Sequence, residues 1–343
     1  MTAALTFQIE VVREGTSSFP CEADDVILRA GLRAGMALPY ECNVGGCGNC
    51  KFQLVEGEID PGWLDAPGTS PRDRDRKRYL ACQARPLSNC KVKFLGIAEE
   101  HLDERPLRRK AELTGVADVT HDIREFRLRT NGAAWFTPGQ YALLRVPGVN
   151  FWRAYSMSNI PNAEGNWEFM IRKVPGGAAT TALFDHLEVG DCIELDGPYG
   201  FAGLKRNNNR DIICIAGGSG VSAMVSIVRG VVQEPNIALK NIHFFYGART
   251  VRDVVDRTVV SGDDTAGVSI NFHPVVSDNA GAESTWNGPT GLVHEHVVSV
   301  MGNDLGGYEV YMAGPPPMVT TAQKILQSQC NVLRDRIHYD RFF

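Results

Sequence analysis

Four cysteines constrain this chain more than any other feature, because three of them lie within nine residues. Their spacing is C-x4-C-x2-C followed by a distant fourth, and the set is Cys42, Cys47, Cys50 and Cys82. This is the ligand spacing of one class of [2Fe–2S] cluster, in which each iron binds two thiolates. The intervening glycines let a short loop fold closely around a cluster and direct N–H groups at its sulfurs. The cysteines therefore predict a [2Fe–2S] centre.

A cysteine-rich loop can also serve a structural purpose or bind zinc. Four structural cysteines can fill a core as small apolar side chains, but three of them interleaved with glycines in nine residues are costly for that purpose. A zinc site usually has two C-x2-C pairs, and Cys82 has no close cysteine partner on its far side. The pattern favours iron.

The bulk composition describes an ordinary globular protein. A chain of 343 residues allows two or three domains, and its net charge of −5 gives no sign of nucleic-acid binding. We find no signal peptide and no run of about eighteen apolar residues, so we expect a cytoplasmic monomer with no membrane segment. Five further cysteines are then expected to be free and mostly buried, namely Cys21, Cys90, Cys192, Cys214 and Cys330.

The first 98 residues are predicted to form one α+β domain around the cysteines. Residues 5–11 alternate as a half-buried strand does, a helix is expected over residues 26–34, and strands are expected over residues 51–55 and 90–95. A dense charge run spans Arg72–Arg78. It is typical of a solvated helix face, and alternatively it would form a docking surface for an acidic partner beside the cluster.

Two further domains are predicted after a charged linker at residues 99–108. Residues 109–206 contain many short alternating segments separated by turn signals, which indicates a small antiparallel barrel. From residue 207 the pattern changes, because residues 212–216 are continuously apolar and precede Gly217-Gly-Ser-Gly220 and a helix. Residues 207–343 therefore predict a parallel α/β sheet whose ligands bind at the carboxyl ends of the strands.

Two short motifs in the barrel suggest a site for a pyrophosphate. Arg153-Ala-Tyr155-Ser156 falls on an expected strand, and Pro175-Gly-Gly-Ala-Ala-Thr180 follows it as a glycine turn that opens a helix. An arginine together with such a turn is a good clamp for phosphate groups. A strand arginine and an ordinary turn would explain each motif alone, but the two together, with the cluster, favour the clamp.

In this order, the cluster loop, the R-x-Y-S barrel and the G-G-x-G sheet resemble a plant-type ferredoxin fused to a ferredoxin–NADP reductase-like module. The resemblance covers the whole chain. It is strongest to the reductase components of bacterial soluble di-iron monooxygenases of the toluene, alkene and isoprene type, through residues 39–51, 81–87 and 340–343. It implies a β-grasp ferredoxin domain, an antiparallel FAD-binding β-barrel and a Rossmann-like NAD-binding domain.

The resemblance also implies roles for the barrel motifs. Arg153 would hold the FAD pyrophosphate, Tyr155 would pack on the flavin, and Ser156 would face its N5 atom. A second set of residues would bind FAD phosphate, namely Gly176, Gly177 and Thr180. Thr180 stands where the family often has serine, so the hydroxyl is kept.

In the last domain, the resemblance places the nicotinamide dinucleotide against two glycine-containing turns. They contribute Gly217, Gly218, Gly220, Gly314 and Pro315. Ala313 replaces a cysteine that usually flanks the nicotinamide, which puts the rate of hydride delivery in doubt but not the reaction class.

Two further expectations concern the choice of dinucleotide and the flavin. Asp278 stands where NADP-using relatives carry an arginine, so it predicts NADH, although Arg249 also follows a strand and could bind a phosphate. Phe342 and Phe343 are expected to cover the flavin ring, and with Ser156 they complete the expected catalytic group. Packing between domains would explain the two aromatic residues as well.

The function expected from these features is electron transfer. Electrons would pass from NADH to FAD, then to the [2Fe–2S] cluster, and then to a Rieske-type ferredoxin or a di-iron hydroxylase. No paired E-x-x-H oxygenase motif occurs in the chain. The alternative enzyme is the reductase of an aromatic-ring dioxygenase or phenol hydroxylase, which shares every cofactor motif, and a non-enzyme alternative is a flavin-binding redox sensor.

Overall fold

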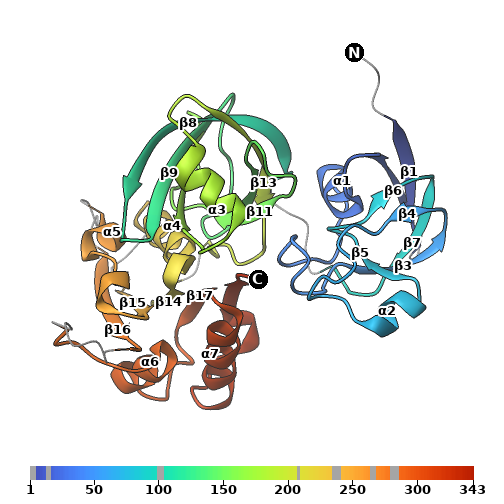
Figure 1. Cartoon of the computed structure of the whole chain (residues 1–343). Helices are drawn as coiled ribbons and strands as arrows, with labels where there is room; N and C mark the ends of the chain where they lie inside the picture. Colours follow the sequence, from blue (N-terminus) through green and yellow to red (C-terminus); the bar gives the residue numbers. More distant parts are fainter. Residues whose placement is uncertain are drawn as a thin grey trace. The chain divides into compact units, whose positions relative to one another are not determined.

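The computed structural model describes residues 5–12, 17–98, 104–206, 209–233, 241–262, 268–278 and 286–343. The chain divides into two compact units (Figure 1). The first comprises residues 1–107 together with Phe343, and the second comprises residues 108–342.

The first unit is a five-stranded mixed sheet with a helix packed against it. The strand order is β2-β1-β7-β3-β5, in which β1 and β7 run parallel and the other neighbours run antiparallel. Its elements are β1 (Thr6–Val11), β2 (Ser17–Glu22), α1 (Ile27–Arg33), β3 (Lys51–Glu56), β4 (Ile59–Asp60), α2 (Pro71–Asp75), β5 (Arg78–Leu80), β6 (Arg85–Pro86) and β7 (Cys90–Phe94). Helix α1 is buried along most of its length, and Gly31 lets it approach Phe19 of β2 closely. The expected β-grasp arrangement is confirmed.

The second unit begins with a six-stranded antiparallel sheet of order β11-β10-β13-β8-β9-β12. Its elements are β8 (Leu107–Asp118), β9 (Ile123–Thr130), β10 (Tyr141–Arg145), β11 (Arg153–Ser156), β12 (Asn166–Arg172), α3 (Ala178–Thr181), the π-helical turn η1 (Ala182–His186) and β13 (Cys192–Tyr199). A bridge between Met157 and Phe169 joins the two edge strands, so the sheet curls into the expected barrel. Trp167 and Phe169 fill its centre.

A five-stranded parallel sheet follows, with the order β16-β15-β14-β17-β18. Its elements are β14 (Ile212–Gly217), η2 (Gly218–Gly220), α4 (Val221–Val232), β15 (Asn241–Ala248), η3 (Val251–Asp253), α5 (Arg257–Ser261), β16 (Ser269–Val276), α6 (Val293–Met301), β17 (Glu309–Gly314), α7 (Pro316–Ser328), η4 (Arg334–Arg336) and β18 (Ile337–Arg341). Strand β14 is buried along its whole length, as a central parallel strand requires. The α/β prediction is confirmed.

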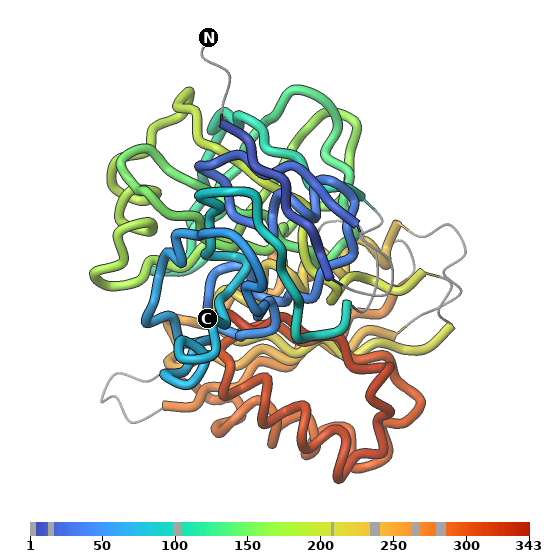
Figure 2. The backbone as a smooth tube through the Cα atoms, turned by 90° about the vertical axis from the view of Figure 1, so that its right-hand side faces the viewer, coloured from blue at the N-terminus to red at the C-terminus, as the bar shows by residue number. Residues whose placement is uncertain are grey.

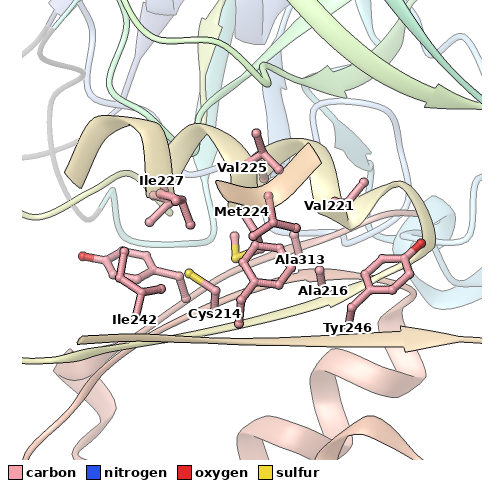
Figure 3. Close-up of a cluster of buried hydrophobic side chains, with 14 of the residues drawn as sticks. Cys214, Ala216, Val221, Met224, Val225, Ile227, Ile242, Tyr246 and Ala313 are labelled. Carbon is pink, nitrogen blue, oxygen red and sulfur yellow. The ribbon is translucent and has the colours of Figure 1, made fainter. Parts of the chain in front are cut away.

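Helices cover both faces of this parallel sheet. On one face α4 packs Met224 and Ile227 against Cys214 and Ile242 of the sheet, in the apolar cluster drawn in Figure 3. On the other face α6 and α7 lie side by side beneath the strands (Figure 2). The ends of the strands are therefore where ligands are expected to approach this sheet.

Helix α4 also contacts the barrel through one polar stripe. The hydroxyl of Ser222 donates to the carbonyl of Ser156 at 2.6 Å and accepts from the N–H of Met170 at 3.1 Å. One turn later Ser226 donates to the carbonyl of Asn159 at 2.7 Å. A further turn on, Arg229 donates to the Ser158 carbonyl at 3.0 Å. These bonds join buried backbone groups of the barrel to side chains of α4.

Strand β8 already begins at Leu107, inside the segment expected to be a linker, while residues 99–103 and 207–208 lie outside the described residues. All nine cysteines are free thiols, and of the five not assigned to the cluster only Cys192 is exposed. Among the described helices, none is both long and apolar enough to span a membrane.

Candidate functional site

The cysteine loop between α1 and β3 wraps tightly around its own sulfurs. Gly45 and Gly48 have φ values of +92° and +81°, which side chains rarely tolerate, and Asn43 has a φ of +57°. Cys42 and Cys50 are buried, and so is Cys82 in the turn after β5. Cys47 is partly exposed. The structure therefore brings all four expected ligands together around one small volume.

Hydrogen-bond donors point at these sulfurs. The N–H of Cys47 lies 3.4 Å from Cys42 Sγ, and the N–H of Asn49 lies 3.4 Å from Cys47 Sγ. The amide of Gln83 donates to Cys82 Sγ at 3.6 Å. Such donors stabilise thiolate charge and tune the potential of a cluster that the sulfurs ligate.

The four thiols are arranged as two pairs. A hydrogen bond from Cys47 lowers the pKa of Cys42 to about 6, against the opposing effect of burial. The hydrogen bond between Cys50 and Cys82 raises the pKa of Cys50 well above its usual range, and burial adds to that effect. Two pairs of adjacent sulfurs supplied with N–H donors are what two irons sharing two sulfides require, so the residues present fit a [2Fe–2S] cluster.

In the second unit, β11 presents the R-x-Y-S side chains. The Arg153 guanidinium lies 4.1 Å from the centre of the Phe151 ring, and burial lowers the pKa of Arg153. Burial raises the pKa of Tyr155 to about 12. Ser156 is buried at the end of the strand. An arginine and a tyrosine held in a half-buried environment fit the binding of a planar, anionic cofactor.

Ser156 has a partner that sequence reasoning missed. Its hydroxyl donates to the Asp340 carboxylate at 3.3 Å, and Asp340 belongs to β18 at the far end of the chain. Strand β18 pairs in parallel with β17, which sets Asp340 beside Ala313. The only sequence signal was its position two residues before Phe342.

The glycine turn after β12 is closed by Thr180. Its hydroxyl accepts from the N–H of Val174 at 3.1 Å and reaches the Gly177 carbonyl at 3.1 Å. A Cβ atom on Gly177 would lie 2.8 Å from this hydroxyl, so the residue has to stay small. Gly176 has a φ of +71° with open space around it. The threonine therefore holds the turn in shape, and the turn leaves Gly176 open on its outer side.

A cavity of about 520 Å³ opens at the carboxyl ends of β14, β15 and β17. This is the edge of a parallel sheet where ligands are expected. Its lining includes Gly217, Gly218, Tyr246, Arg249, Asp253, Ser277, Pro315, Met318 and Phe342. The structure thus gathers there most of the residues expected to meet the dinucleotide.

The glycines of the two turns at this edge of the sheet are required by close approach of neighbouring atoms. A Cβ on Gly220 would lie 2.0 Å from the carbonyl oxygen of Ala313, and one on Gly217 would lie 2.5 Å from the Met318 sulfur. Gly314 has a φ of +150° and packs against Gly217. The two turns therefore form one wall, and Ala313 contributes to it as a fully buried residue.

Arg172, which was not predicted, projects over the same wall from the barrel. One of its terminal nitrogens would lie 3.5 Å from a Cβ on Gly218. The guanidinium also donates to Asp122 at 2.6 Å and to Asp253 at 3.4 Å. A second cavity of about 770 Å³ shares Arg172, Asp122 and Arg249 with the first. The only clue in the sequence was a basic pair just before the glycine turn.

Three of the expected site residues lie in different surroundings: one lines the cavity, and the other two are exposed. Phe342 lines the cavity of about 520 Å³, and its N–H donates to the Gly314 carbonyl at 3.0 Å. Phe343 is half exposed and is grouped with the first unit. Asp278 is exposed, and its N–H donates to the carbonyl of Arg249 at 2.7 Å, whereas the neighbouring Ser277 lines the cavity.

Three family models match successive segments of the chain. Residues 11–87 match the 2Fe-2S iron-sulfur cluster binding domain, residues 110–202 the oxidoreductase FAD-binding domain, and residues 214–324 the oxidoreductase NAD-binding domain. The chain therefore has domains for all three expected cofactors.

Full-length relatives show the same organisation. A ferredoxin–NAD(P)+ reductase of Metapseudomonas resinovorans is 39% identical over 342 residues, covering 98% of this chain and 100% of the relative. The ferredoxin–NAD+ reductase component of an alkene monooxygenase system of Xanthobacter autotrophicus is 34% identical, with 95% and 98% covered. The solved structure of a ferredoxin reductase in carbazole 1,9a-dioxygenase superposes with a TM-score of 0.91 at 36% identity and covers both chains completely. This chain belongs to the family of iron–sulfur flavoprotein reductases that act as electron-transfer components of multicomponent oxygenase systems.

Proposed function

We propose that this protein passes electrons from NADH through FAD and a [2Fe–2S] cluster to a Rieske-type ferredoxin of an oxygenase system. The observation that supports this most is the placement of the barrel and the dinucleotide cavity in one unit, where Asp340 of the parallel sheet reaches Ser156 of the barrel. When bound, FAD accepts a hydride from NADH and the [2Fe–2S] cluster carries single electrons onward.

The residues of the chain have distinct roles in this proposal. Cys42, Cys47, Cys50 and Cys82 hold the cluster, and the N–H groups around them stabilise its negative charge. Arg153 and the Gly176–Gly177 turn bind the FAD pyrophosphate, Thr180 keeps that turn closed, and Tyr155 packs on the flavin. Ser156 offers its hydroxyl at the reactive edge, where Asp340 orients it.

The dinucleotide binds in the 520 Å³ cavity, whose lining includes Gly217, Gly218 and Pro315. Its phosphates lie against the turn that runs from Gly217 to Gly220, and its nicotinamide end lies toward the turn of Gly314 and Pro315. Phe342 forms one wall of that cavity and excludes water from the flavin until the nicotinamide arrives. We assign NADH as the donor, because an exposed carboxylate at Asp278 repels a 2′-phosphate and can accept a hydrogen bond from a free ribose hydroxyl. We also place the domain boundaries at residues 98, 108 and 206.

Two oxygenase classes remain as acceptor systems for this reductase. The names of the two relatives described above refer to ferredoxin reductases, and this favours a separate ferredoxin over direct delivery to a hydroxylase. A di-iron monooxygenase system agrees with the alkene monooxygenase relative. An aromatic-ring dioxygenase agrees equally with the reductase from the carbazole system.

Reconstitution tests the proposal. The purified holoprotein would be mixed with NADH and, in parallel, with a Rieske-type ferredoxin, a di-iron hydroxylase or a ring-hydroxylating dioxygenase. We expect rapid NADH-dependent reduction of the ferredoxin and slow reduction of the isolated oxygenases. A protein whose flavin is reduced by NADH but which reduces none of these acceptors would be a sensor and would contradict the proposal.

A further inference from the structure

The loop of residues 61–70 exposes two large apolar side chains beside the cysteine loop. Trp63 and Leu64 are 48% and 45% exposed. Large aromatic side chains usually bury most of their surface, and tryptophan is enriched where proteins bind one another. An exposed pair of this kind next to a redox centre is a candidate contact for another protein.

This exposure is not caused by a loose loop, because residues 61–70 are fixed to the cysteine loop. The N–H of Gly68 donates to the Gly45 carbonyl at 2.9 Å, and a Cβ on Gly68 would lie 2.7 Å from the Gly48 nitrogen. Trp63 itself is 3.4 Å from the Cβ position of Gly45. The indole therefore lies directly on the loop that carries three of the cluster ligands.

Helix α2 is held next to this loop by charged contacts. Arg74 pairs with Asp65 at 3.3 Å, and Asp73 accepts from Lys51 at 2.9 Å. Lys51 follows the ligand Cys50 directly in sequence. The apolar pair, α2 and the cluster ligands thus form one connected region of the first unit.

The exposed charges of that region are mainly positive. Residues 61–78 contain five basic and three acidic side chains, a net charge of +2 in a chain whose net charge is −5. Asp73 is buried, whereas Arg72, Arg76 and Lys77 are exposed. Among the described residues, none forms an ion pair with these three cations. Their charges are therefore available to a partner.

We propose that Trp63, Leu64, Arg72, Arg74, Arg76 and Lys77 form the docking surface for the external electron acceptor, and that this acceptor is an acidic protein. We name these residues the Trp63 surface. The inference rests on the proposed function, which requires an acceptor outside the chain, and adds where it binds and what charge it carries.

Two physical requirements favour this surface. Electron transfer slows steeply with distance, so an acceptor has to dock against the loop that carries the cluster. Clustered positive charge attracts an acidic partner and raises its association rate, while a central aromatic side chain supplies most of the binding energy once the surfaces meet. The Trp63 surface combines both features next to the ligands.

The test uses the full-length holoprotein with NADH and two protein probes of opposite charge. The acidic probe is the soluble domain of cytochrome b5, and the basic probe is cytochrome c. The variants are Trp63→Ala and the double variant Arg72→Glu/Arg76→Glu. Iron content and the visible spectrum establish that each variant keeps its cluster. If Trp63→Ala loses the cluster, the double variant tests the docking surface on its own.

Matched controls carry the same changes elsewhere. Trp135 of the barrel is 50% exposed, so Trp135→Ala controls for the loss of a surface indole. Arg129→Glu/Arg334→Glu reverses two exposed arginines and changes the net charge by the same amount. Neither control touches the cysteine loop or the dinucleotide cavity.

We expect Arg72→Glu/Arg76→Glu to lower kcat/KM for cytochrome b5 about tenfold at low ionic strength, with little difference near 1 M salt, where charges are screened within about 3 Å. Activity toward cytochrome c should be unchanged or higher. Trp63→Ala should lower kcat/KM for cytochrome b5 about tenfold at both salt concentrations. Both controls should behave like the parent.

Other outcomes overturn the inference in distinguishable ways. If the parent reduces a small dye but neither cytochrome, electron export itself fails and so does the proposed function. If the parent reduces both cytochromes and the variants match their controls, only the docking surface is wrong. If Trp63→Ala slows reduction of the cluster in a single turnover without acceptor, the surface serves electron transfer within the chain and the inference is wrong.

Discussion

The hydroxyl of Ser156 donates to the carboxylate of Asp340 at 3.3 Å, although 184 residues separate the two in sequence. One comes from the R-x-Y-S strand of the barrel and the other from the last strand of the parallel sheet. Their contact makes the far end of the chain part of the site that we propose for the flavin. The hydroxyl proton of Ser156 therefore has a defined acceptor, the Asp340 carboxylate.

We predict that Ser156→Ala and Asp340→Asn both slow reduction of the flavin by NADH, by about tenfold or more, because the first removes the hydroxyl beside the reacting atoms and the second removes the negative charge of its acceptor. Single-turnover absorbance measures the rate. Asp335→Asn, an exposed carboxylate in the preceding η4 turn, is the control and should not change it. Parent-like rates in both variants would show that this pair has no part in hydride transfer.

Cys47→Ser should weaken or abolish the cluster while NADH still reduces the flavin. The reason is that the cysteine loop lies in the first unit, whereas the residues assigned to FAD lie in the second. Iron analysis, flavin content and visible absorbance measure the two effects separately. Cys192→Ser replaces an exposed cysteine and should retain both cofactors. Zinc without iron in the anaerobically purified parent would refute the cluster assignment.

The parent should use NADH with a higher kcat/KM than NADPH, and Asp278→Asn should narrow that preference about tenfold by removing the charge that repels a 2′-phosphate. Steady-state kinetics with both dinucleotides measure the ratio. Asp256→Asn, an exposed carboxylate that caps α5, is the control. Equal or better kcat/KM with NADPH in the parent would reject the assignment of Asp278.

Phe342→Ala should change the flavin spectrum and the affinity for nicotinamide, because Phe342 lines the dinucleotide cavity. Deletion of Phe343 should have the smaller effect, since that residue is half exposed. Flavin absorbance and single-turnover reduction compare the two. If both variants match the parent in spectrum and rate, neither ring stacks on the flavin and the aromatic residues serve packing alone.

Gly220→Ala should destabilise the second unit by about 1–3 kcal/mol and weaken dinucleotide binding, because its Cβ would lie 2.0 Å from the Ala313 carbonyl oxygen. Denaturant unfolding and NADH titration measure the two losses. Gly307→Ala is a matched control, since a Cβ there meets nothing within 4 Å. Equal stability of both variants would mean that the wall of the cavity can move apart.

The sequence was most informative where function depends on short spacing. The ligands from Cys42 to Cys50 come from one loop, so their pattern predicted their chemistry directly, and continuous apolar residues predicted the buried strand β14. It was least informative where partners come from distant segments. Arg172 and Asp340 look like ordinary strand residues until the fold sets one over Gly218 and the other beside Ser156.

The terminal aromatic pair shows a different limit. Adjacent residues at the end of a strand point in different directions, so a shared role for Phe342 and Phe343 did not follow from their adjacency. The structure puts Phe342 in the lining of the cavity and leaves Phe343 half exposed. For Thr180, the sequence suggested a contact with phosphate but not a structural role. In the structure its hydroxyl closes the glycine turn.

The polar stripe on α4 has a consequence for how the molecule melts. Ser222, Ser226 and Arg229 bind backbone groups of the barrel, and Met170 of the barrel packs into the apolar cluster around α4. Separating the barrel from the parallel sheet would therefore break these hydrogen bonds and expose apolar surface to water. The two lobes of the second unit should therefore unfold together, in one calorimetric transition, while the first unit gives its own. A fragment ending near residue 206 should be recovered only as an aggregate, whereas a fragment that contains both lobes should fold.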